Sequence, residues 1–443
     1  MNIILLSGGS GKRLWPLSND IRSKQFIKFF KKENGETESM IQRIYRQIKS
    51  ADSSAVITIA TSKSQLSSIY NQLGDNVDVS AEPCRRDTFP AIALAAAYLH
   101  DKKGISDDTA VIICPVDPYV NEEYFAFLKK LEMQVNTGMS NLTLMGITPT
   151  YPSEKYGYII PQTRDDISLV KTFKEKPDIH DAKKYINMGA LWNGGIFACK
   201  LGYLLKKVQE LTGYNSYYEL FNNYSELPKI SFDYAVVEKE KKIAVLRFSG
   251  QWKDIGTWNT LTESMPNVSI GHSVMNDKCT NVHIINELNI PIVAMGLNDV
   301  VISASHDGIL VSDKEQSSYI KPYVDKIEQR TMFAEKSWGS FKIINVEDDS
   351  LTIKVTLNAG HKMNYHSHQK RDEIWNVISG NGIAVIDGEK TDLYQGDVIK
   401  IKKNTKHTII AKTNLKLVEI QIGNEITVHD KQKFELDDNS NNV

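Results

Sequence analysis

The sequence predicts three parts: an α/β domain built on a doubly wound parallel sheet, a short β module, and an all-β jelly-roll domain. Its 443 residues are too many for one hydrophobic core, so two or three domains are expected. Apolar runs rich in β-branched residues alternate with helical stretches up to about residue 150, which is typical of βαβ units. From Trp338 to Ile422 the chain consists of short strands spaced by Gly, Asn and Asp turns, which is typical of a jelly roll. We therefore expect domains at 1–265, 266–330 and 331–430, and a polar tail at 431–443 whose residues 435–443 are disordered.

The parallel sheet is predicted from strand-like runs with helical stretches between them. The strands are expected at 3–8, 55–61, 77–83, 109–117 and 142–148, and the helices at 39–50, 62–73, 88–101 and 122–135. Ligands of such a sheet bind at the carboxyl ends of its strands. The polar strings SGGSG, AEPCRR and CPVD follow three of these strands and mark the expected site.

The elements after residue 150 follow a mixed pattern. We expect strands at 156–162, 169–177 and 190–200, and a helix at 201–211. Residues 270–320 are very short apolar runs split by polar turns, which predicts a spacer of coiled strands. A linking helix is expected at 319–330.

Composition excludes several classes of protein. The formal net charge of −1 argues against general binding to nucleic acid or to a membrane surface. No apolar stretch approaches the roughly 18 residues of a membrane span, and the opening MNIILLSGG is typical of a buried strand and not of a signal peptide. The four cysteines lie far apart and form no CxxC pair, so we interpret them as buried, reduced thiols of a cytoplasmic protein.

The string SGGSGKR after the first strand is the first candidate binding site. It is not a P-loop, which needs Gly at Leu6 and Ser or Thr at Arg13, and it lacks the third Gly of a dinucleotide loop at Leu14. Glycines without a Cβ still let backbone N–H groups approach phosphates. Arg13 can grip a pyrophosphate with its guanidinium, and Lys24 adds a compact positive charge.

Seven motifs in order carry a resemblance to a known family. They are SGGSGKRLWPL with a downstream KQF, EPCRRDTFPAIALAAA, CPVDPYV, FKEKP, WNGGIF, DYAVVEK and QWKDIGTW. Together they resemble the sugar-1-phosphate nucleotidyltransferases over residues 1–265, and Trp15 with KQF is typical of the bacterial mannose-1-phosphate guanylyltransferases. The resemblance implies a Rossmann-like nucleotidyltransferase domain that joins a nucleoside triphosphate, by expectation GTP, to mannose 1-phosphate.

The resemblance also implies the roles of individual residues. Arg13, Lys24, Asp117 and Asp254 would be catalytic, with the two aspartates holding Mg²⁺. The nucleotide would contact Ser7, Gly8, Gly9, Gly11, Arg13, Glu82, Arg85, Asp87 and Thr88, and the sugar phosphate would contact Gly157, Glu175, Lys176 and Asn193. In-line attack of a sugar-phosphate oxygen on the α-phosphorus would expel pyrophosphate.

Three departures from the family pattern leave alternatives open. Ser23 stands where Pro is usual, Asp87 where Asn is usual, and Pro118 where His is usual. The substrates could therefore be another sugar 1-phosphate with CTP or UTP, and Asp87 could simply cap the following helix. A third reading is a binding protein that senses sugar nucleotides. Whether the chain forms a homo-oligomer stays open.

The string GHKMNYHSHQKRDEIWNVISG is the second candidate site. Gly360, His366, His368, Glu373 and Gly380 stand at the positions of the first cupin motif. Gly396 to His407 fits the second motif, except at Lys402 and Asn404. Three imidazoles and a carboxylate from neighbouring strands suit a divalent transition metal, which could be Zn, Mn, Fe, Ni or Co.

The order of domains resembles that of bacterial enzymes in which a type II mannose-6-phosphate isomerase cupin follows the guanylyltransferase. The isomerase version ends in RAEHW where this chain has RDEIW. Arg371, Glu373 and Trp375 fit, whereas Asp372 and Ile374 depart. Isomerase activity with a role for Arg371 is one expectation. The alternatives are a different sugar-phosphate substrate for the cupin, or a cupin that serves packing and ligand sensing.

Overall fold

The chain folds into two compact units, each described here by itself. The computed structural model describes residues 1–9, 12–19, 21–265, 267–328, 330–427 and 429–436. The first unit comprises Met1–Leu14, Ser23–Leu66 and Asp75–Asn267, and the second comprises Trp15–Arg22, Ser67–Gly74 and Val268–Val443. The disorder expected for residues 437–443 lies outside the described residues.

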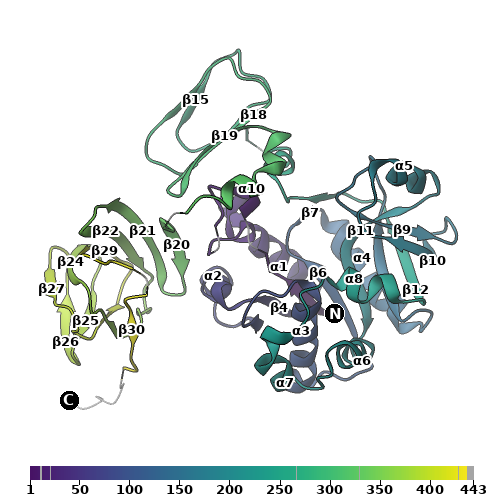
Figure 1. The fold of residues 1–443 in the computed structure, drawn as a ribbon, viewed down its shortest axis with the longest axis horizontal. Helices are drawn as coiled ribbons and strands as arrows, with labels where there is room; N and C mark the ends of the chain where they lie inside the picture. The colour runs from purple at the N-terminus through teal and green to yellow at the C-terminus, as the bar shows by residue number, and fades with distance from the viewer. Residues whose placement is uncertain (10–11, 20, 266, 329, 428, 437–443) are drawn as a thin grey trace. The chain divides into compact units, whose positions relative to one another are not determined.

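The first unit is centred on a nine-stranded sheet (Figure 1). Its strands, in spatial order, are β5 (Asp78–Glu82), β4 (Val56–Ser62), β1 (Asn2–Leu6), β6 (Ala110–Pro115), β11 (Leu191–Lys200), β8 (Leu142–Ile147), β12 (Ile243–Phe248), β10 (Ile167–Lys174) and β9 (Gly157–Pro161). Strands β5, β4, β1 and β6 are parallel as predicted, but β11 runs antiparallel to both of its neighbours β6 and β8. The sheet is therefore mixed, because beyond β6 the chain forms hairpins such as β9–β10, whose strands must alternate in direction.

Helices cover the sheet on both sides. Helix α3 (Thr88–Lys103) packs on β1, β4 and β5 and against α6 (Leu201–Thr212), α7 (Tyr217–Asn222) and α8 (Phe232–Ala235). Helix α4 (Glu122–Asn136) packs on β6, β8, β11 and β12 and against α1 (Met40–Ala51). Shorter elements complete this unit: β2 (Lys28–Lys31), β3 (Thr37–Ser39), α5 (Ile179–Asn187) and α9 (Trp258–Thr262).

Helix α3 begins where the sequence predicts because its first turn is capped. The Asp87 carboxylate accepts a hydrogen bond of 2.8 Å from the Thr88 N–H, which confirms the capping interpretation of Asp87. The helix ends at Gly104, whose φ of 65° is left-handed and suits glycine. The capped start of α3 follows β5 directly, at the carboxyl edge of the parallel strands.

A two-stranded ribbon follows β6 at that same edge. It pairs β7 (Pro118–Val120) with β13 (Trp252–Asp254) in antiparallel register, with Pro118 opposite Asp254 and Tyr119 opposite Lys253. The ribbon therefore brings together two segments more than 130 residues apart in sequence. It is the element that positions both predicted aspartates.

The second unit contains the β spacer and the jelly roll. The spacer has parallel pairings among β14 (Ser269–Ile270), β16 (His283–Asn286) and β18 (Val300–Ser305), and between β15 (Ser273–Met275) and β17 (Ile292–Ala294), with β19 (Gly308–Asp313) antiparallel at the edge. These pairings confirm coiled strands. The linking helix is shorter than predicted: α10 spans only Lys321–Val324, with Pro322 in its first turn. This unit also contains α2, which spans Leu66–Leu73.

The jelly roll consists of two sheets around one apolar core. One has the order β20 (Phe333–Lys336), β21 (Gly339–Val346), β22 (Ser350–Leu357), β29 (Leu415–Ile422), β24 (Asp372–Ser379) and β27 (Val398–Ile401). The other has the order β26 (Glu389–Leu393), β25 (Gly382–Ile386), β28 (His407–Ala411), β23 (His366–Ser367) and β30 (Gln432–Lys433). Alternate residues of each strand face the core, as for Leu415 and Leu417 on β29.

Two further expectations concern cysteines and membrane spans. All four cysteines are free thiols, but only Cys114 and Cys199 are buried, whereas Cys84 and Cys279 are partly exposed. Burial raises the pKa of both Cys114 and Cys199 to about 12, so these two thiols stay protonated. Among the described residues, each helix is too short or too polar to span a bilayer.

Candidate active site

The glycine loop leaves the carboxyl end of β1 with its open side toward solvent. Gly8 and Gly9 are exposed, and a Cβ placed on either would meet no atom within 4 Å. Gly9 has a φ of 118°, which L side chains rarely adopt, so glycine is required there. Gly11, the third glycine expected to contact the nucleotide, lies outside the described residues.

The inner side of the loop is held by buried polar side chains. Ser7 is fully buried, so it lies beneath the loop and not on its open side. The carbonyl oxygens of Ser7 and Gly9 accept hydrogen bonds from Ser23, Gln25, Thr61 and Gln65. The loop is therefore anchored from below and free above, as a site for phosphates would need.

The predicted catalytic lysine and aspartates come together beside the ribbon. Lys24 Nζ lies 2.6 Å from Asp117 Oδ2 and donates a hydrogen bond of 3.0 Å to the Ile255 carbonyl, one residue after Asp254. Burial would lower the pKa of Lys24, but the charges of Asp117 and Asp254 outweigh it and raise that pKa. Burial raises the pKa of Asp254, Lys24 opposes this rise, and Asp117 adds to it. The two carboxylates thus share one lysine and repel one another, which is a setting that favours a bound cation.

The remaining residues expected at the nucleotide occupy different settings. Arg13 is exposed in the turn Lys12–Leu14, and its charge lowers the pKa of Lys24 and of Asp254, which places it near both. Glu82 is buried at the end of β5 and accepts a 2.7 Å hydrogen bond from the Tyr224 hydroxyl. The Thr88 hydroxyl accepts from the Phe232 N–H at 2.8 Å, so it ties α3 to α8.

Arg85, the last residue of that set, is partly buried in the AEPCRR string after β5. Its charge lowers the pKa of Glu82, whereas burial, the largest influence, raises it. The structure therefore places Arg85 and Glu82 in one electrostatic group at the carboxyl edge of the sheet.

The residues expected at the sugar phosphate form a second cluster where β9, β10 and β11 meet. Asn193 pairs with Gly157 across β11 and β9. Glu175 Oε1 forms a 2.7 Å ion pair with Lys176, while Glu175 Oε2 is buried without a hydrogen-bond partner among the described residues. A Cβ on Gly157 would lie 2.4 Å from that oxygen, so only glycine fits.

Sequence reasoning missed Asp233 in this cluster. Asn193 Nδ2 donates to Asp233 Oδ1 at 2.6 Å, and burial together with the charge of Glu175 raises the pKa of Asp233 to about 6. Asp233 stands in the DYAVVEK motif, but its pairing with Asn193 joins positions 40 residues apart. The motif therefore indicates that the DYAVVEK segment matters, but only the fold shows that Asp233 belongs to the sugar-phosphate cluster.

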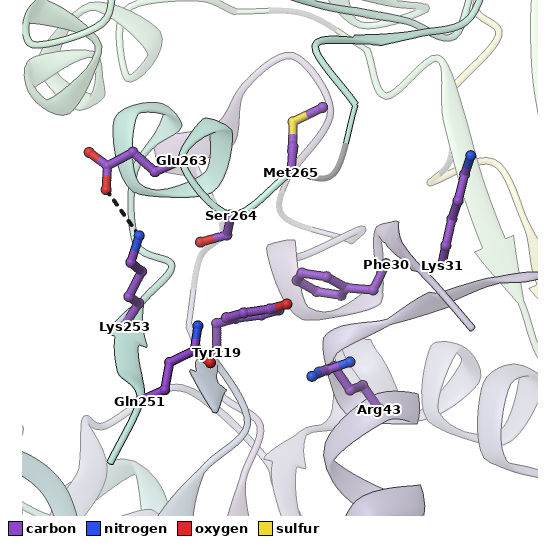
Figure 2. A pocket seen from close by; sticks show the side chains of 9 residues that line it. All are labelled: Phe30, Lys31, Arg43, Tyr119, Gln251, Lys253, Glu263, Ser264 and Met265. Atoms are coloured by element: carbon purple, nitrogen blue, oxygen red, sulfur yellow. Dashed lines mark ion pairs between the residues drawn. The ribbon is translucent and has the colours of Figure 1, made fainter. Parts of the chain in front are cut away.

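A cavity of about 340 Å³ lies on the other face of the ribbon (Figure 2). It is lined by Phe30, Lys31, Arg43, Tyr119, Gln251, Lys253, Glu263, Ser264 and Met265. Phe30 and Tyr119 stack with ring centroids 5.6 Å apart, and the Arg43 guanidinium lies 4.9 Å from the Tyr119 ring. Because Tyr119 and Lys253 are register partners, they share one ribbon face, and neighbouring Asp254 points to the opposite one. Asp254 therefore faces away from the cavity.

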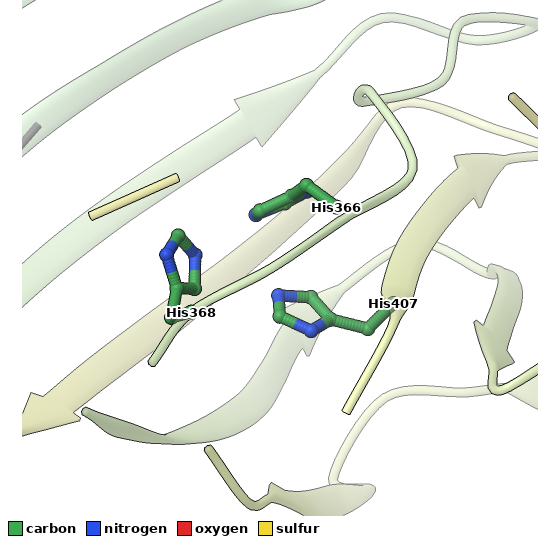
Figure 3. Close-up of side chains that lie close together, drawn as sticks. All are labelled: His366, His368 and His407. Carbon is green, nitrogen blue, oxygen red and sulfur yellow. The ribbon is translucent and has the colours of Figure 1, made fainter. Parts of the chain in front are cut away.

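In the second unit, the three predicted histidines converge on one point inside the jelly roll (Figure 3). His366, His368 and His407 each offer a nitrogen, and these atoms lie within 4.8 Å of one another. Each Nδ1 faces a backbone carbonyl, which can only accept, so Nδ1 carries the proton and Nε2 is left as an acceptor. Burial lowers the pKa of His366 to about 2 and that of His368 to about 4, so both rings are neutral at pH 7.

Glu373 completes this set and supplies a direct test of fit for a metal. Its Oε1 lies 3.1 Å from His368 Nε2, and its Oε2 lies 3.4 Å from His407 Nε2. His407 Nε2 is buried and has no hydrogen-bond partner among the described residues. Acceptor atoms that face one another without a proton between them fit a shared cation, so the residues present suit a divalent metal.

Arg371 lies against the same ligand atoms. Its Nη2 donates to His368 Nε2 at 2.9 Å and its Nε donates to Glu373 Oε1 at 3.0 Å. Glu419 and Gln421 also face this interior, and Gln421 bonds Glu419. Both occupy inward positions of β29. In the string LKLVEIQIG they stand at the alternate positions that begin with two leucines, where apolar residues would be expected. That signal was available in the sequence and was missed.

The comparisons with known proteins agree with this geometry. Residues 2–269 match the family model described as nucleotidyl transferase, and residues 324–436 match the one described as mannose-6-phosphate isomerase C-terminal. A mannose-1-phosphate guanylyltransferase of Salmonella muenchen is 28% identical, covering 98% of this chain and 97% of its own. The xanthan biosynthesis protein XanB of Xanthomonas campestris pv. campestris is 27% identical, with 98% and 97% covered. The crystal structure of a mannose-1-phosphate geranyltransferase from Thermus thermophilus has a TM-score of 0.61 and 25% identity, covering 74% of this chain and 99% of that one. Because the first model spans more than half of the sequence and the strand order, glycine loop and aspartate pair accompany it, the chain belongs to the nucleotidyl transferase family.

Proposed function

We propose that this enzyme joins GTP to mannose 1-phosphate and releases GDP-mannose and pyrophosphate. The observation that carries the proposal is the contact of Lys24 with Asp117, beside Asp254 and the glycine loop. Relatives that match nearly the whole chain are named mannose-1-phosphate guanylyltransferases, which supports this choice of substrates. We propose that it acts in the cytoplasm, where free thiols such as its four cysteines stay reduced.

The proposed nucleotide site divides binding and charge among a few groups. The amides of Gly8 and Gly9 and the Arg13 guanidinium would hold the triphosphate, and Gly11 would extend the loop. Lys24 would place a positive charge beside the α-phosphorus, where charge develops as the sugar-phosphate oxygen attacks. Asp117 and Asp254 would hold Mg²⁺, which when bound neutralises charge on the leaving pyrophosphate. Glu82, Arg85, Asp87 and Thr88 would line the base and ribose side.

The proposed sugar site explains why its residues are polar yet half-buried. The free oxygen of Glu175 would accept a sugar hydroxyl, and Asn193 would hold another. Lys176 would pair with the sugar phosphate, and Gly157 would let the sugar approach the backbone. These contacts orient the attacking oxygen without a proton-transfer group of their own.

For the cupin we propose isomerisation between mannose 6-phosphate and fructose 6-phosphate. His366, His368, Glu373 and His407 would hold a divalent metal, which when bound polarises the sugar oxygens. Arg371 would bind the anionic end of the substrate once it leaves its present contacts. The supporting observations are the converging Nε2 atoms and the match of residues 324–436.

Pyrophosphate release across four nucleoside triphosphates and several sugar 1-phosphates, with and without Mg²⁺, tests the transferase proposal. GTP with mannose 1-phosphate should be the fastest pair, and another pair far ahead of it would replace these substrates. Nucleotide binding without turnover would instead favour the sensing function. Mannose 6-phosphate supplied with each of Zn, Mn, Fe, Ni and Co in turn should yield fructose 6-phosphate. No product with any of the five metals would leave the cupin with a structural or sensing role.

A further inference from the structure

Four buried side chains hold the carbonyl groups of Ser7 and Gly9 of the glycine loop from inside. The Ser7 carbonyl accepts from Gln25 Nε2 at 3.1 Å and from Thr61 Oγ1 at 3.0 Å. The Gly9 carbonyl accepts from Ser23 Oγ at 3.1 Å and from Gln65 Nε2 at 3.2 Å. We call Ser23, Gln25, Thr61 and Gln65 the loop clamp. Each member is at most 2% exposed, so these hydrogen bonds are shielded from water.

The clamp determines the direction in which the loop presents its donors. In a trans peptide the carbonyl and the following N–H point in opposite directions, and the described peptide bonds are trans except Trp15–Pro16. Because the Ser7 carbonyl points inward to two donors, the Gly8 N–H points toward the exposed side of the loop. Holding the Gly9 carbonyl also fixes the backbone of Gly9, whose φ of 118° would otherwise be one of many glycine conformations.

Ser23 departs from the family pattern, and Gln65 stands outside the seven motifs. Gln65 Nε2 also donates to Ser23 Oγ, and Gln65 Oε1 accepts from Thr61 Oγ1 at 2.9 Å, so the two halves of the clamp are joined. Ser23 stands directly before Lys24, with φ −71° and ψ 159°. A proline could adopt that φ, so the backbone alone does not require serine. What serine adds is the hydroxyl that bonds the Gly9 carbonyl.

We infer that Ser23 and Gln65 are positioning residues for nucleotide binding, which they pre-organise by fixing the loop amides toward the phosphates. The inference rests on the proposed function of the loop as the nucleoside triphosphate site. Pre-organised donors bind an anion more tightly because the loop loses no further freedom on binding. Among the described residues, the hydrogen bonds and ion pair of Glu175, Lys176 and Asn193 are made within their own cluster and not with the clamp. The affinity for the sugar phosphate should therefore not depend on Ser23 and Gln65.

The test compares Ser23→Ala, Ser23→Pro, Ser23→Thr and Gln65→Met with the full-length wild type. We expect Ser23→Ala, Ser23→Pro and Gln65→Met to raise the Kd and KM for GTP about tenfold, which equals about 1.4 kcal/mol. The KM for mannose 1-phosphate should change less than about twofold, and Ser23→Thr, which keeps the hydroxyl, should restore GTP binding. Ser62→Ala is the matched control, because Ser62 is a buried serine that bonds Ser64 and not the loop.

The outcomes separate the inference from the proposed function. The inference would be overturned if Ser23→Ala and Gln65→Met bind GTP as tightly as the wild type does. It would also be overturned if they lose as much affinity for mannose 1-phosphate as for GTP. Neither outcome would contradict the proposed transferase activity. A wild type that binds none of the four nucleoside triphosphates would overturn the proposed function and the inference together. If Ser23→Ala lowers Tm as much as Ser62→Ala does, but only Ser23→Ala weakens GTP, the positioning role is supported over a merely structural one.

Discussion

Replacing Asp233 with Asn should make the enzyme more stable at neutral pH. The Asp233 carboxylate accepts a hydrogen bond from Asn193. Burial and the nearby charge of Glu175 raise the pKa of Asp233 from 3.8 to about 6. Asn is the same size and still offers an oxygen to Asn193 Nδ2. The substitution therefore removes the charge and keeps the hydrogen bond.

The size of the effect follows from the pKa of Asp233. Each tenfold change in a protonation constant is worth about 1.4 kcal/mol, so the move from 3.8 to about 6 costs about 3 kcal/mol of unfolding free energy once Asp233 is ionised. Between pH 3.8 and about 6, Asp233 keeps its proton in the native state but loses it in the unfolded state. The unfolding free energy of the wild type should thus fall as pH rises from about 4 to about 6 and then level off.

Thermal unfolding of both proteins at pH 4.5 and 7.5 measures this difference. At pH 7.5 Asp233→Asn should raise the Tm of the transferase unit by about 6 to 12 °C, and at pH 4.5 the gain should shrink. Glu175→Gln in the wild type should move the loss of stability to lower pH, because it removes a charge that raises the pKa of Asp233. Asp165→Asn removes an exposed carboxylate and is the control. An equal Tm for Asp233→Asn and wild type at pH 7.5 would refute the reasoning.

The other predictions concern catalysis, sugar binding and the cupin metal. Asp117→Asn and Asp254→Asn should each lower pyrophosphate release at least about 100-fold, because the cation site loses half its charge; near-wild-type turnover would remove both residues from the site. Gly157→Ala should raise the KM for mannose 1-phosphate about tenfold and leave the Kd for GTP unchanged, because the added methyl would lie 2.4 Å from Glu175 Oε2; an unchanged sugar KM would contradict this placement. Arg371→Met should raise the affinity for divalent metal about tenfold in calorimetry, because the guanidinium bonds His368 Nε2 and Glu373 Oε1; His407→Ala should lower it, and weaker binding by Arg371→Met would disprove the competition.

The sequence predicts the elements of the first unit better than their arrangement. Strands β1, β4, β5 and β6 and helix α3 are recognisable because their apolar periods and caps are local. The antiparallel direction of β11 is not predictable, since it depends on pairing with strands that are far away in the chain. The α10 helix is shorter than predicted: Pro322 in its first turn is compatible with its start, but the helix ends at Val324, before the predicted end at residue 330.

The candidate sites divide in the same way. The glycine loop, Lys24 and the two aspartates are recognisable because each stands in a motif. Gln65 is not, because it reaches Gly9 across 56 positions of sequence and stands in an ordinary helical stretch. Glu419 is an intermediate case, since the alternation of β29 places it inward but does not reveal its partner.

The polar atoms that the described residues leave unsatisfied indicate which ligand each cluster takes. Asp117 and Asp254 place two carboxylates beside Lys24, with Arg13 nearby, and carboxylate oxygens are ligands that suit Mg²⁺. Glu175 Oε2 is a single buried acceptor beside a strand, which suits a neutral hydroxyl donor such as that of a sugar. His407 Nε2 faces a carboxylate oxygen and has no hydrogen-bond partner among the described residues, an arrangement that suits a bound metal. Each cluster is costly to bury on its own, so its charge and geometry are explained by the ligand that would complete it.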